Sequence, residues 1–243
     1  MDIFTLLANG TPELLNGLRV TVLVTVGGCV LTLLISFLLG LAAGAHNLAI
    51  RGVARVVIEF FRGTSLVVQL FWFVYAMPLI FQVKFDSKIA IGILVLGLNY
   101  GAYGSEIVRG AIAAVPKAQW EACVALNFTT WQKLRLVVIP QAWVEMIPPF
   151  GNLGIQVLKG SALVSLIGLV DLTAAAQRLR SHASAADAVI IFAVLLVVYF
   201  VMSYLLASGM RWLERRGKAG LGQGPPDKPT FTQGGLKASE VAG

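Results

Sequence analysis

The stretch from Val20 to Ala43 reads VTVLVTVGGCVLTLLISFLLGLAA. It contains no Asp, Glu, Lys or Arg, and a helix needs roughly 20 mostly apolar residues to cross a bilayer. In the whole chain of 243 residues, 57% are hydrophobic, 13% are charged, and the mean hydropathy is +0.81. Soluble domains hold about 25% charged residues, and disordered chains are poor in apolar ones. The composition therefore excludes both classes and indicates a polytopic membrane protein.

Four further stretches hold at most one charged residue over a length that can span a membrane. The predicted spans are residues 20–43, 63–82, 89–108, 149–169 and 188–210. The fourth carries Lys159 near its middle, so a re-entrant segment is the alternative there. We expect an all-α membrane protein with one transmembrane domain over residues 1–216. Residues 217–243, rich in Gly, Pro, Lys and Gln, are expected to form a disordered cytoplasmic tail.

The distribution of Lys and Arg predicts the orientation of these five helices. The connections on one side hold eleven such residues and those on the other hold five, Lys159 and the distal tail not counted. The richer side has Arg51, Arg55, Arg62, Arg109, Lys117, Lys133, Arg135, Arg211, Arg215, Arg216 and Lys218; the poorer side has Arg19, Lys84, Lys88, Arg178 and Arg180. Because cytoplasmic connections are enriched in these residues, we expect the N-terminus outside and the C-terminus inside. The same bias explains the net charge of +7 without a nucleic-acid partner.

The longest internal connection, residues 110–148, has the pattern of two helices separated by a tight break. Pro116 suits the first turn of a helix, and Asn127 tolerates the left-handed conformation that often ends one. Thr129 and Gln132 have the spacing of a capping box for the next helix. The pattern predicts a rigid cytoplasmic projection; an amphipathic helix lying on the lipid surface is the alternative.

This connection resembles the EAA loop of the ABC importer permeases. In that family the pattern is Glu-Ala-Ala, then a Gly, then Ile-x-Leu-Pro. Here Glu121 and Ala122 match, Cys123 replaces the second Ala, Asn127 replaces the Gly, and Pro140 falls at the expected place. The departure at Asn127 preserves the backbone requirement, because Asn adopts left-handed conformations more readily than most residues.

Further motifs over residues 15–215 resemble the polar amino acid uptake branch of these permeases. They are residues 62–70, 102–110, 116–122, 140–142 and 158–163. Within the branch, details resemble the ectoine/hydroxyectoine permeases, namely residues 97–104, 125–129, 148–153 and 159–163. The resemblance implies an import function for a small zwitterion, with ectoine or hydroxyectoine as the first expectation and a polar amino acid as the alternative.

The resemblance also implies a fold, a location and partners. The fold would be that of a type I (MetI-like) importer permease in the bacterial inner membrane. The chain would pair with itself or with a second similar permease, and an ATPase dimer would bind beneath. That dimer would hold the ATP, and this chain would bind no cofactor. An extracytoplasmic solute-binding protein would deliver the substrate. The residues expected to couple to the ATPase are Gln119, Trp120, Glu121, Ala122, Leu126 and Asn127.

The expected substrate path comprises polar and aromatic residues of the spans. A charge at the centre of a spanning helix costs about 2.5–3.5 kcal/mol on insertion scales. Lys159 is therefore expected to pair either with a substrate carboxylate or with Glu106 or a partner permease. Aromatic faces suit a delocalised cation, and span amides either face the path or bridge helices. The candidates are Lys159, Gln69, Trp72, Asn99, Tyr100 and Ser161.

Other classes of protein fit the sequence poorly. Two cysteines and two histidines give no disulfide framework and no metal spacing. No nucleophile or metalloprotease motif is present, so we expect neither a catalytic nor a metal site. An ion-driven carrier or channel is a distant alternative, since the sequence shows none of the internal repeats that many carriers have.

Overall fold

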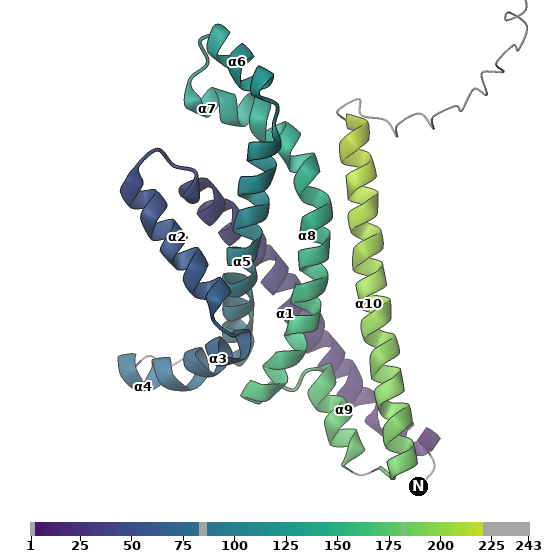
Figure 1. The fold of residues 1–243 in the computed structure, drawn as a ribbon. Coiled ribbons are helices and arrows are strands. Elements are labelled where there is room, and N and C mark those ends of the chain that lie inside the picture. Colours follow the sequence, from purple (N-terminus) through teal and green to yellow (C-terminus); the bar gives the residue numbers. More distant parts are fainter. Residues whose placement is uncertain (1–2, 83–86, 182, 221–243) are drawn as a thin grey trace, which may run out of the picture.

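The computed structural model describes residues 3–82, 87–181 and 183–220, and all regular elements in these ranges are helical (Figure 1). The α-helices are α1 (Ile3–Ala43), α2 (Leu48–Gly63), α3 (Leu66–Phe71), α4 (Met77–Phe81), α5 (Lys88–Ala114), α6 (Lys117–Ala125), α7 (Thr130–Gln132), α8 (Ile139–Ser161), α9 (Leu172–Arg180) and α10 (Ala185–Gly220). Short π-helical segments join α3 to α4 and α7 to α8, and a 3-10 helix follows α8. The prediction of an all-helical protein is confirmed for these residues.

Four helical stretches in the described chain are long and apolar enough to cross a membrane. They are Gly10–Ala43, Lys88–Ala114, Thr130–Ile167 and Ala185–Ala219. A fifth span exists if Leu48–Gly63 and Leu66–Phe81 together make one broken span. Most of the predicted span 149–169 is thus the second half of a longer helical stretch. The predicted tail starts too early, because residues 217–220 still belong to α10. Residues 221–243 and Lys84 lie outside the described residues.

The predicted span at 63–82 forms the second half of a sharply bent helix pair. Leu66–Phe81 lies at 102° to α2, and in Figure 1 α3 and α4 run across the long helices. Thr64 and Ser65 at the break have extended backbones, with ψ angles of 149° and 132°. Helix α2, the first half of this pair, is amphipathic and carries Arg51, Arg55, Glu59 and Arg62. These charges are the reason why it was not among the predicted spans.

The centre of the bundle is the close contact between α1 and α5. A Cβ added to Gly97 or Gly101 would lie 2.6 Å from a side-chain carbon of Leu31 or Ile35, respectively. The Ser36 hydroxyl on α1 donates to the Thr32 carbonyl oxygen (2.6 Å) and to the Gly101 carbonyl oxygen of α5 (3.3 Å). Small residues let spanning helices approach closely, and packing then holds them together where no hydrophobic driving force exists.

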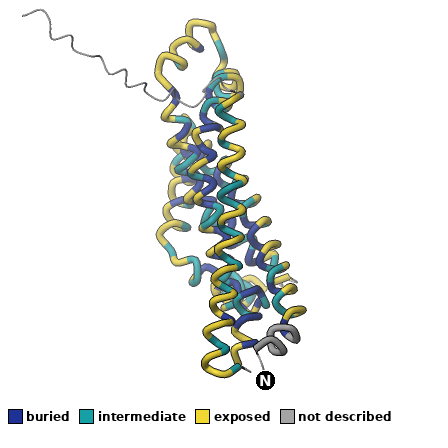
Figure 2. Tube along the Cα trace, turned by 90° about the vertical axis from the view of Figure 1, so that its right-hand side faces the viewer, coloured by how far each residue is buried: buried dark blue, intermediate teal, exposed yellow. Residues whose placement is uncertain are grey.

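Two buried clusters extend this contact toward the two ends. One joins α1, α3, α5 and the 3-10 helix, and its fully buried members include Val24, Leu70 and Val164. The other joins α5 to α8 and the segment before it, with Val108, Val138 and Met146 at its centre. Much of α10 is exposed, as is the projection formed by α6 and α7 (Figure 2). These exposed surfaces are therefore left for lipid or for other chains.

Helix α9 is fixed to α1 by a buried cap. Asp171 has no exposed surface, and its Oδ1 accepts a hydrogen bond from the Ala174 amide (2.9 Å). The Leu172 amide donates to Thr21 Oγ1 (3.1 Å). A Cβ at Gly17 would lie 2.7 Å from the Asp171 carbonyl oxygen, so α1 and α9 touch here. Burial raises the pKa of the Asp171 carboxyl, and the arrangement holds α9 in one place.

The described chain has two distinct ends. Helices α6 and α7 and the C-terminal end of α10 lie together at one end, and α9 lies at the other with the N-terminus (Figure 1). We call these the hairpin end and the α9 end. The long helices run between the two ends, so a movement at one end can be transmitted to the other through these helices.

Replacement of Gly40 by Ala should test the α1–α5 contact. An added Cβ would lie 2.8 Å from Val108 Cβ and 2.9 Å from the Ser105 carbonyl oxygen, so the helices must separate. Overpacking of this kind typically costs about 1–3 kcal/mol, and we expect a lower Tm in detergent. Gly209→Ala on α10 is the matched control, because nothing lies within 4 Å of its Cβ. Equal Tm values for the two variants would contradict the account.

Candidate functional site

The projection at the hairpin end is built around a left-handed residue. Helix α6 begins after Pro116 and ends at Ala125. Asn127 has φ +57°, its amide donates to the Val124 carbonyl (2.9 Å), and the Phe128 amide donates to the Cys123 carbonyl (3.0 Å). These two bonds form the Schellman arrangement that closes a helix C-terminus. The expected left-handed role of Asn127 is confirmed.

The next helix begins with the expected capping box. The Gln132 amide donates to Thr129 Oγ1 (3.3 Å), and the Thr129 amide donates to Gln132 Oε1 (2.8 Å). A π-helical segment, Lys133–Val138, then connects directly to α8. The two helices and their turn form a hairpin, which we define as residues 117–132. The base of the hairpin thus continues as helix into α8, whereas Val115 and Pro116, with extended backbones, join it to α5.

The hairpin presents apolar side chains away from the bundle. Leu126 is 65% exposed, Trp131 66% and Val124 59%. Cys123 faces inward, and Trp120 is half-buried against the cluster that contains Val138. The other predicted coupling residues, Gln119, Glu121, Ala122 and Asn127, are exposed. The structure thus brings all six predicted residues together on one hairpin, five of them accessible to another chain.

Two of the predicted substrate-path residues bridge helices instead of facing an open space. Gln69 and Asn99 are each only 4% exposed. Gln69 Nε2 donates to the Phe61 carbonyl (3.0 Å) and to Thr64 Oγ1 (2.6 Å). Asn99 Nδ2 donates to the same Phe61 carbonyl (3.0 Å) and to Gln69 Oε1 (3.2 Å). These amides satisfy backbone groups that the bend after α2 leaves without helical partners.

The remaining aromatic and hydroxyl candidates are Trp72, Tyr100 and Ser161. Trp72 is 51% exposed on the π-helical segment after α3. Tyr100 packs between α5 and α8, where a Cβ on Gly160 would lie 2.9 Å from Tyr100 Cε2. Ser161 is fully buried, and its hydroxyl donates to the Leu158 carbonyl (2.7 Å). Tyr100 thus contacts the residue before Ser161, whereas Trp72 lies on a separate, exposed segment.

Lys159 lies in a groove between α8, α9 and α10. The groove measures about 520 Å³ and is lined by Lys159, Thr173, Tyr199 and Ser203 together with apolar side chains such as Phe192 and Phe200. Thr173 Oγ1 and the Tyr199 hydroxyl are 3.0 Å apart. No ion pair of Lys159 is found within the described chain, and Glu106 pairs instead with Arg109 (2.7 Å). The groove therefore offers one cation, hydroxyl groups and aromatic faces.

The predicted substrate-path residues do not include Thr173, Tyr199 or Ser203, which line the groove. The only signal was polar residues on apolar helical stretches, which is also typical of packing.

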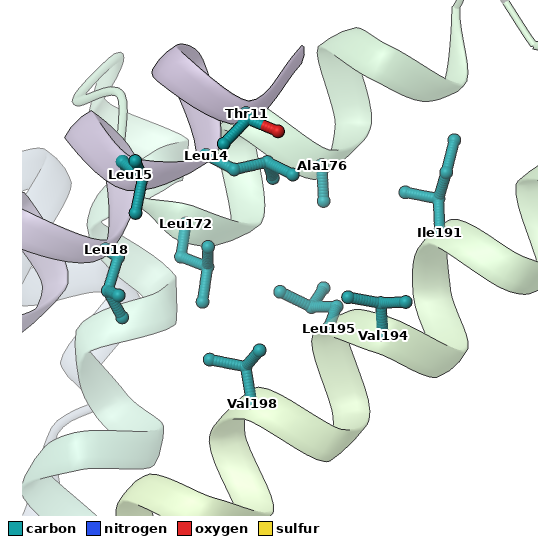
Figure 3. A pocket seen from close by; sticks show the side chains of 10 residues that line it. All are labelled: Thr11, Leu14, Leu15, Leu18, Leu172, Ala176, Ile191, Val194, Leu195 and Val198. Atoms are coloured by element: carbon teal, nitrogen blue, oxygen red, sulfur yellow. The ribbon is translucent and has the colours of Figure 1, made fainter. Parts of the chain in front are cut away.

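A neighbouring cleft is different in character, because apolar side chains from α1, α9 and α10 line about 160 Å³ with Thr11 as the only polar contributor (Figure 3). This cleft suits no polar solute. Within the described residues, no cluster of His, Cys, Asp or Glu has the form of a metal site.

Comparisons with known proteins place these features in a family. The family model "Binding-protein-dependent transport system inner membrane component" matches residues 36–218. A probable amino-acid ABC transporter permease protein of Sinorhizobium fredii is 45% identical over 183 residues, covering 74% of this chain and 76% of the relative. The glutamine transport system permease protein of Escherichia coli is 33% identical over 207 residues, covering 85% of this chain and 94% of the relative.

Solved structures agree with these relatives. A crystal structure of an amino acid ABC transporter with histidines superposes with a TM-score of 0.77 at 33% identity, covering 89% of this chain and 99% of that chain. The inward-facing MetNI methionine ABC transporter superposes with a TM-score of 0.65 at 20% identity over the same share of each chain. The second likeness shows the fold alone, and that fold is the expected MetI-like one.

Asn127 gives a direct test of the hairpin geometry. Asn127→Val places a β-branched residue at φ +57°, where the left-handed conformation costs roughly 1–2 kcal/mol. We expect amide exchange of residues 126–128 to accelerate about 5- to 30-fold, as measured by hydrogen–deuterium exchange. Asn127→Gly is the matched control, because Gly adopts this φ freely. Unchanged exchange in the Val variant would show that the turn does not depend on this conformation.

Proposed function

This chain belongs to the family of binding-protein-dependent transport system inner membrane components, the permease subunits of ABC importers, and we propose that it imports a polar amino acid. The relatives described above are named for amino acids and for glutamine. We therefore place a polar amino acid ahead of ectoine and hydroxyectoine. The latter rest on short motifs such as residues 159–163 and remain the second candidate.

The exposed hairpin carries the proposal that transport is driven by a separate ATPase. Leu126 and Trp131 are large apolar side chains held in water by a well-capped turn. Buried aromatic anchors often dominate the energy of protein interfaces, so these side chains suit a cleft on another protein. The sequence contains no phosphate-binding loop of the P-loop type. The proposed partner is accordingly an ATPase dimer that holds the nucleotide and moves the hairpin.

The proposed orientation follows from charge at the two ends. The hairpin end carries Lys117, Lys133, Arg211, Arg215 and Arg216. Because Lys and Arg are enriched on the cytoplasmic side, the hairpin and the C-terminal end of α10 would face the cytoplasm of a bacterial cell. The α9 end would then face outward from the inner membrane, toward a solute-binding protein. A second permease, or a second copy of this chain, would complete the membrane-spanning unit.

Lys159 is the residue we propose for the substrate carboxylate. It lies on a spanning helix without an ion pair in the described chain, beside the hydroxyl groups of Thr173 and Tyr199. An amino acid zwitterion offers a carboxylate to the ammonium group and further polar atoms to the hydroxyls. Gln69 and Asn99 have a structural role in the proposal, since their amides are already hydrogen-bonded.

Uptake by reconstituted vesicles tests the function and the role of Lys159 together. With the ATPase, the binding protein and any second permease present, we expect ATP-dependent uptake of L-glutamine or another polar amino acid. Lys159→Met should raise the KM for uptake about 10- to 100-fold, because a hydrogen bond to a charged group contributes about 1.5–3 kcal/mol.

Lys159→Arg is the matched control, because it retains the cation and should retain most of the affinity. The amount of assembled complex, measured by size-exclusion chromatography, should be equal for all variants. ATP-independent uptake would favour a carrier and contradict the proposed function. Transport of ectoine but of no amino acid would reverse the order of the two substrates. A normal KM in Lys159→Met would remove Lys159 from the site without affecting the transport function.

A further inference from the structure

A polar hollow at the α9 end has no role in the features described so far. It measures about 420 Å³ and lies between the turn after the 3-10 helix and the outer face of α9. Its polar and turn-forming lining residues are Ser165, Gly168, Gln177, Arg178, Arg180 and Ser181. In contrast to the apolar cleft on the other face of α9, this hollow presents side chains that form hydrogen bonds.

The hollow has an excess of positive charge. Arg178 pairs with Glu13 at 3.2 Å, and its side chain stays 60% exposed. Arg180 is exposed, and no ion pair of its guanidinium is found among the residues that the structure describes. Lys88 donates to the Ile167 carbonyl (3.1 Å), and its Nζ would lie 3.2 Å from a Cβ on Gly168 at the rim. Among the described residues, two arginines thus line the hollow, Lys88 lies at its rim, and Glu13 is the one acid paired with them.

The walls of the hollow are held in place before any partner arrives. Helix α9 buries Leu172, Ala175, Ala176 and Leu179, and Asp171 caps its first turn. The opposing turn is closed by Gly168 at φ +76°, whose amide donates to the Ser165 carbonyl (3.0 Å). A preformed site binds with a smaller loss of conformational freedom than a flexible one. The arginines are thus displayed at the surface of a fixed scaffold.

The position of the hollow links it to the groove that contains Lys159. Ala174 lines the hollow, and Thr173, the preceding residue, lines the groove. The two spaces therefore lie against neighbouring positions of α9, about 100° apart around the helix. The hollow also lies at the end opposite the hairpin. A protein that binds in the hollow would touch the helix that forms one wall of the groove.

We propose that the hollow is the docking site for an acidic side chain of the extracytoplasmic solute-binding protein, held chiefly by Arg180 and Arg178. This inference rests on the proposed function, and the family description names binding-protein dependence. Arg binds carboxylates through two parallel hydrogen bonds, which gives orientation as well as affinity. The carboxylate would give Arg180 the acidic partner that it lacks among the described residues. The contact would also place the binding protein next to the groove.

Stimulation of ATP hydrolysis by the solute-binding protein tests the docking site. The protein used is the one that supports uptake by the wild-type complex in vesicles, so a failure of the proposed function is seen first and separately. Arg180→Glu should raise the binding-protein concentration for half-maximal stimulation about tenfold or more, with the maximal rate little changed. For the wild type, the binding-protein concentration for half-maximal stimulation should rise with ionic strength, as expected for charged contacts at an interface. The variant should lose much of this dependence.

Two further variants complete the test. Arg180→Gln removes the charge without reversing it and should give a smaller increase in the same direction. Arg19→Glu is the matched control, because Arg19 is an exposed arginine in the N-terminal half of α1. Arg19 is two residues beyond Gly17, which faces α9, and so lies about 200° round the helix from that contact. Its half-maximal concentration should equal that of the wild type.

Several outcomes would overturn the docking site. Half-maximal concentrations within twofold of the wild type for Arg180→Glu and for the double variant with Arg178→Glu would do so. An effect of Arg180→Glu that appears only in vesicles with anionic lipid, and vanishes in phosphatidylcholine, would assign the hollow to a lipid headgroup. An equal effect of Arg19→Glu would show general electrostatic attraction in place of a defined site.

Discussion

Backbone polar groups cannot remain unpaired inside a bilayer, and this constraint shapes the whole chain. The described residues satisfy it with helices, and at the one sharp bend they satisfy it with side chains. Gln69 and Asn99 share the Phe61 carbonyl that helix α2 leaves unpaired, so the chain can change direction by 102° between α2 and Leu66–Phe81 without leaving this group unpaired. The close α1–α5 contact then fixes the bend against the rest of the bundle.

The rigid bundle separates three kinds of surface. The hairpin end displays apolar anchors such as Leu126 and Trp131. The groove with Lys159 lies toward the other end, between the last turn of α8, α9 and α10, and the α9 end also displays Arg178 and Arg180. Helix α8 joins the hairpin to the groove, and α9 forms a wall of both the groove and the hollow. In the proposed importer this order is the order of events, from binding protein to substrate to ATPase.

The sequence predicted the features that depend on local chemistry. The left-handed conformation of Asn127 and the capping box of Thr129 and Gln132 are set by residues a few positions apart, and both are confirmed. The bent helix pair was not predicted, because α2 carries charges and hydropathy alone does not recognise it. The partners of Gln69 and Asn99, and the convergence of Thr173 and Tyr199 near Lys159, depend on contacts between distant parts of the chain. Those contacts have no signal in a single sequence.

The central claim is that the hairpin transmits the work of an ATPase into the membrane-spanning helices. Site-specific cross-linking from Ala122→Cys, an exposed position on α6, tests it most directly in the assembled complex. The account predicts a cross-link to the ATPase subunit whose yield changes between the nucleotide-free and ATP-bound states. A cross-link from the control Gly209→Cys on α10 should be absent. If Ala122→Cys never reaches the ATPase in an active transporter, the account is wrong.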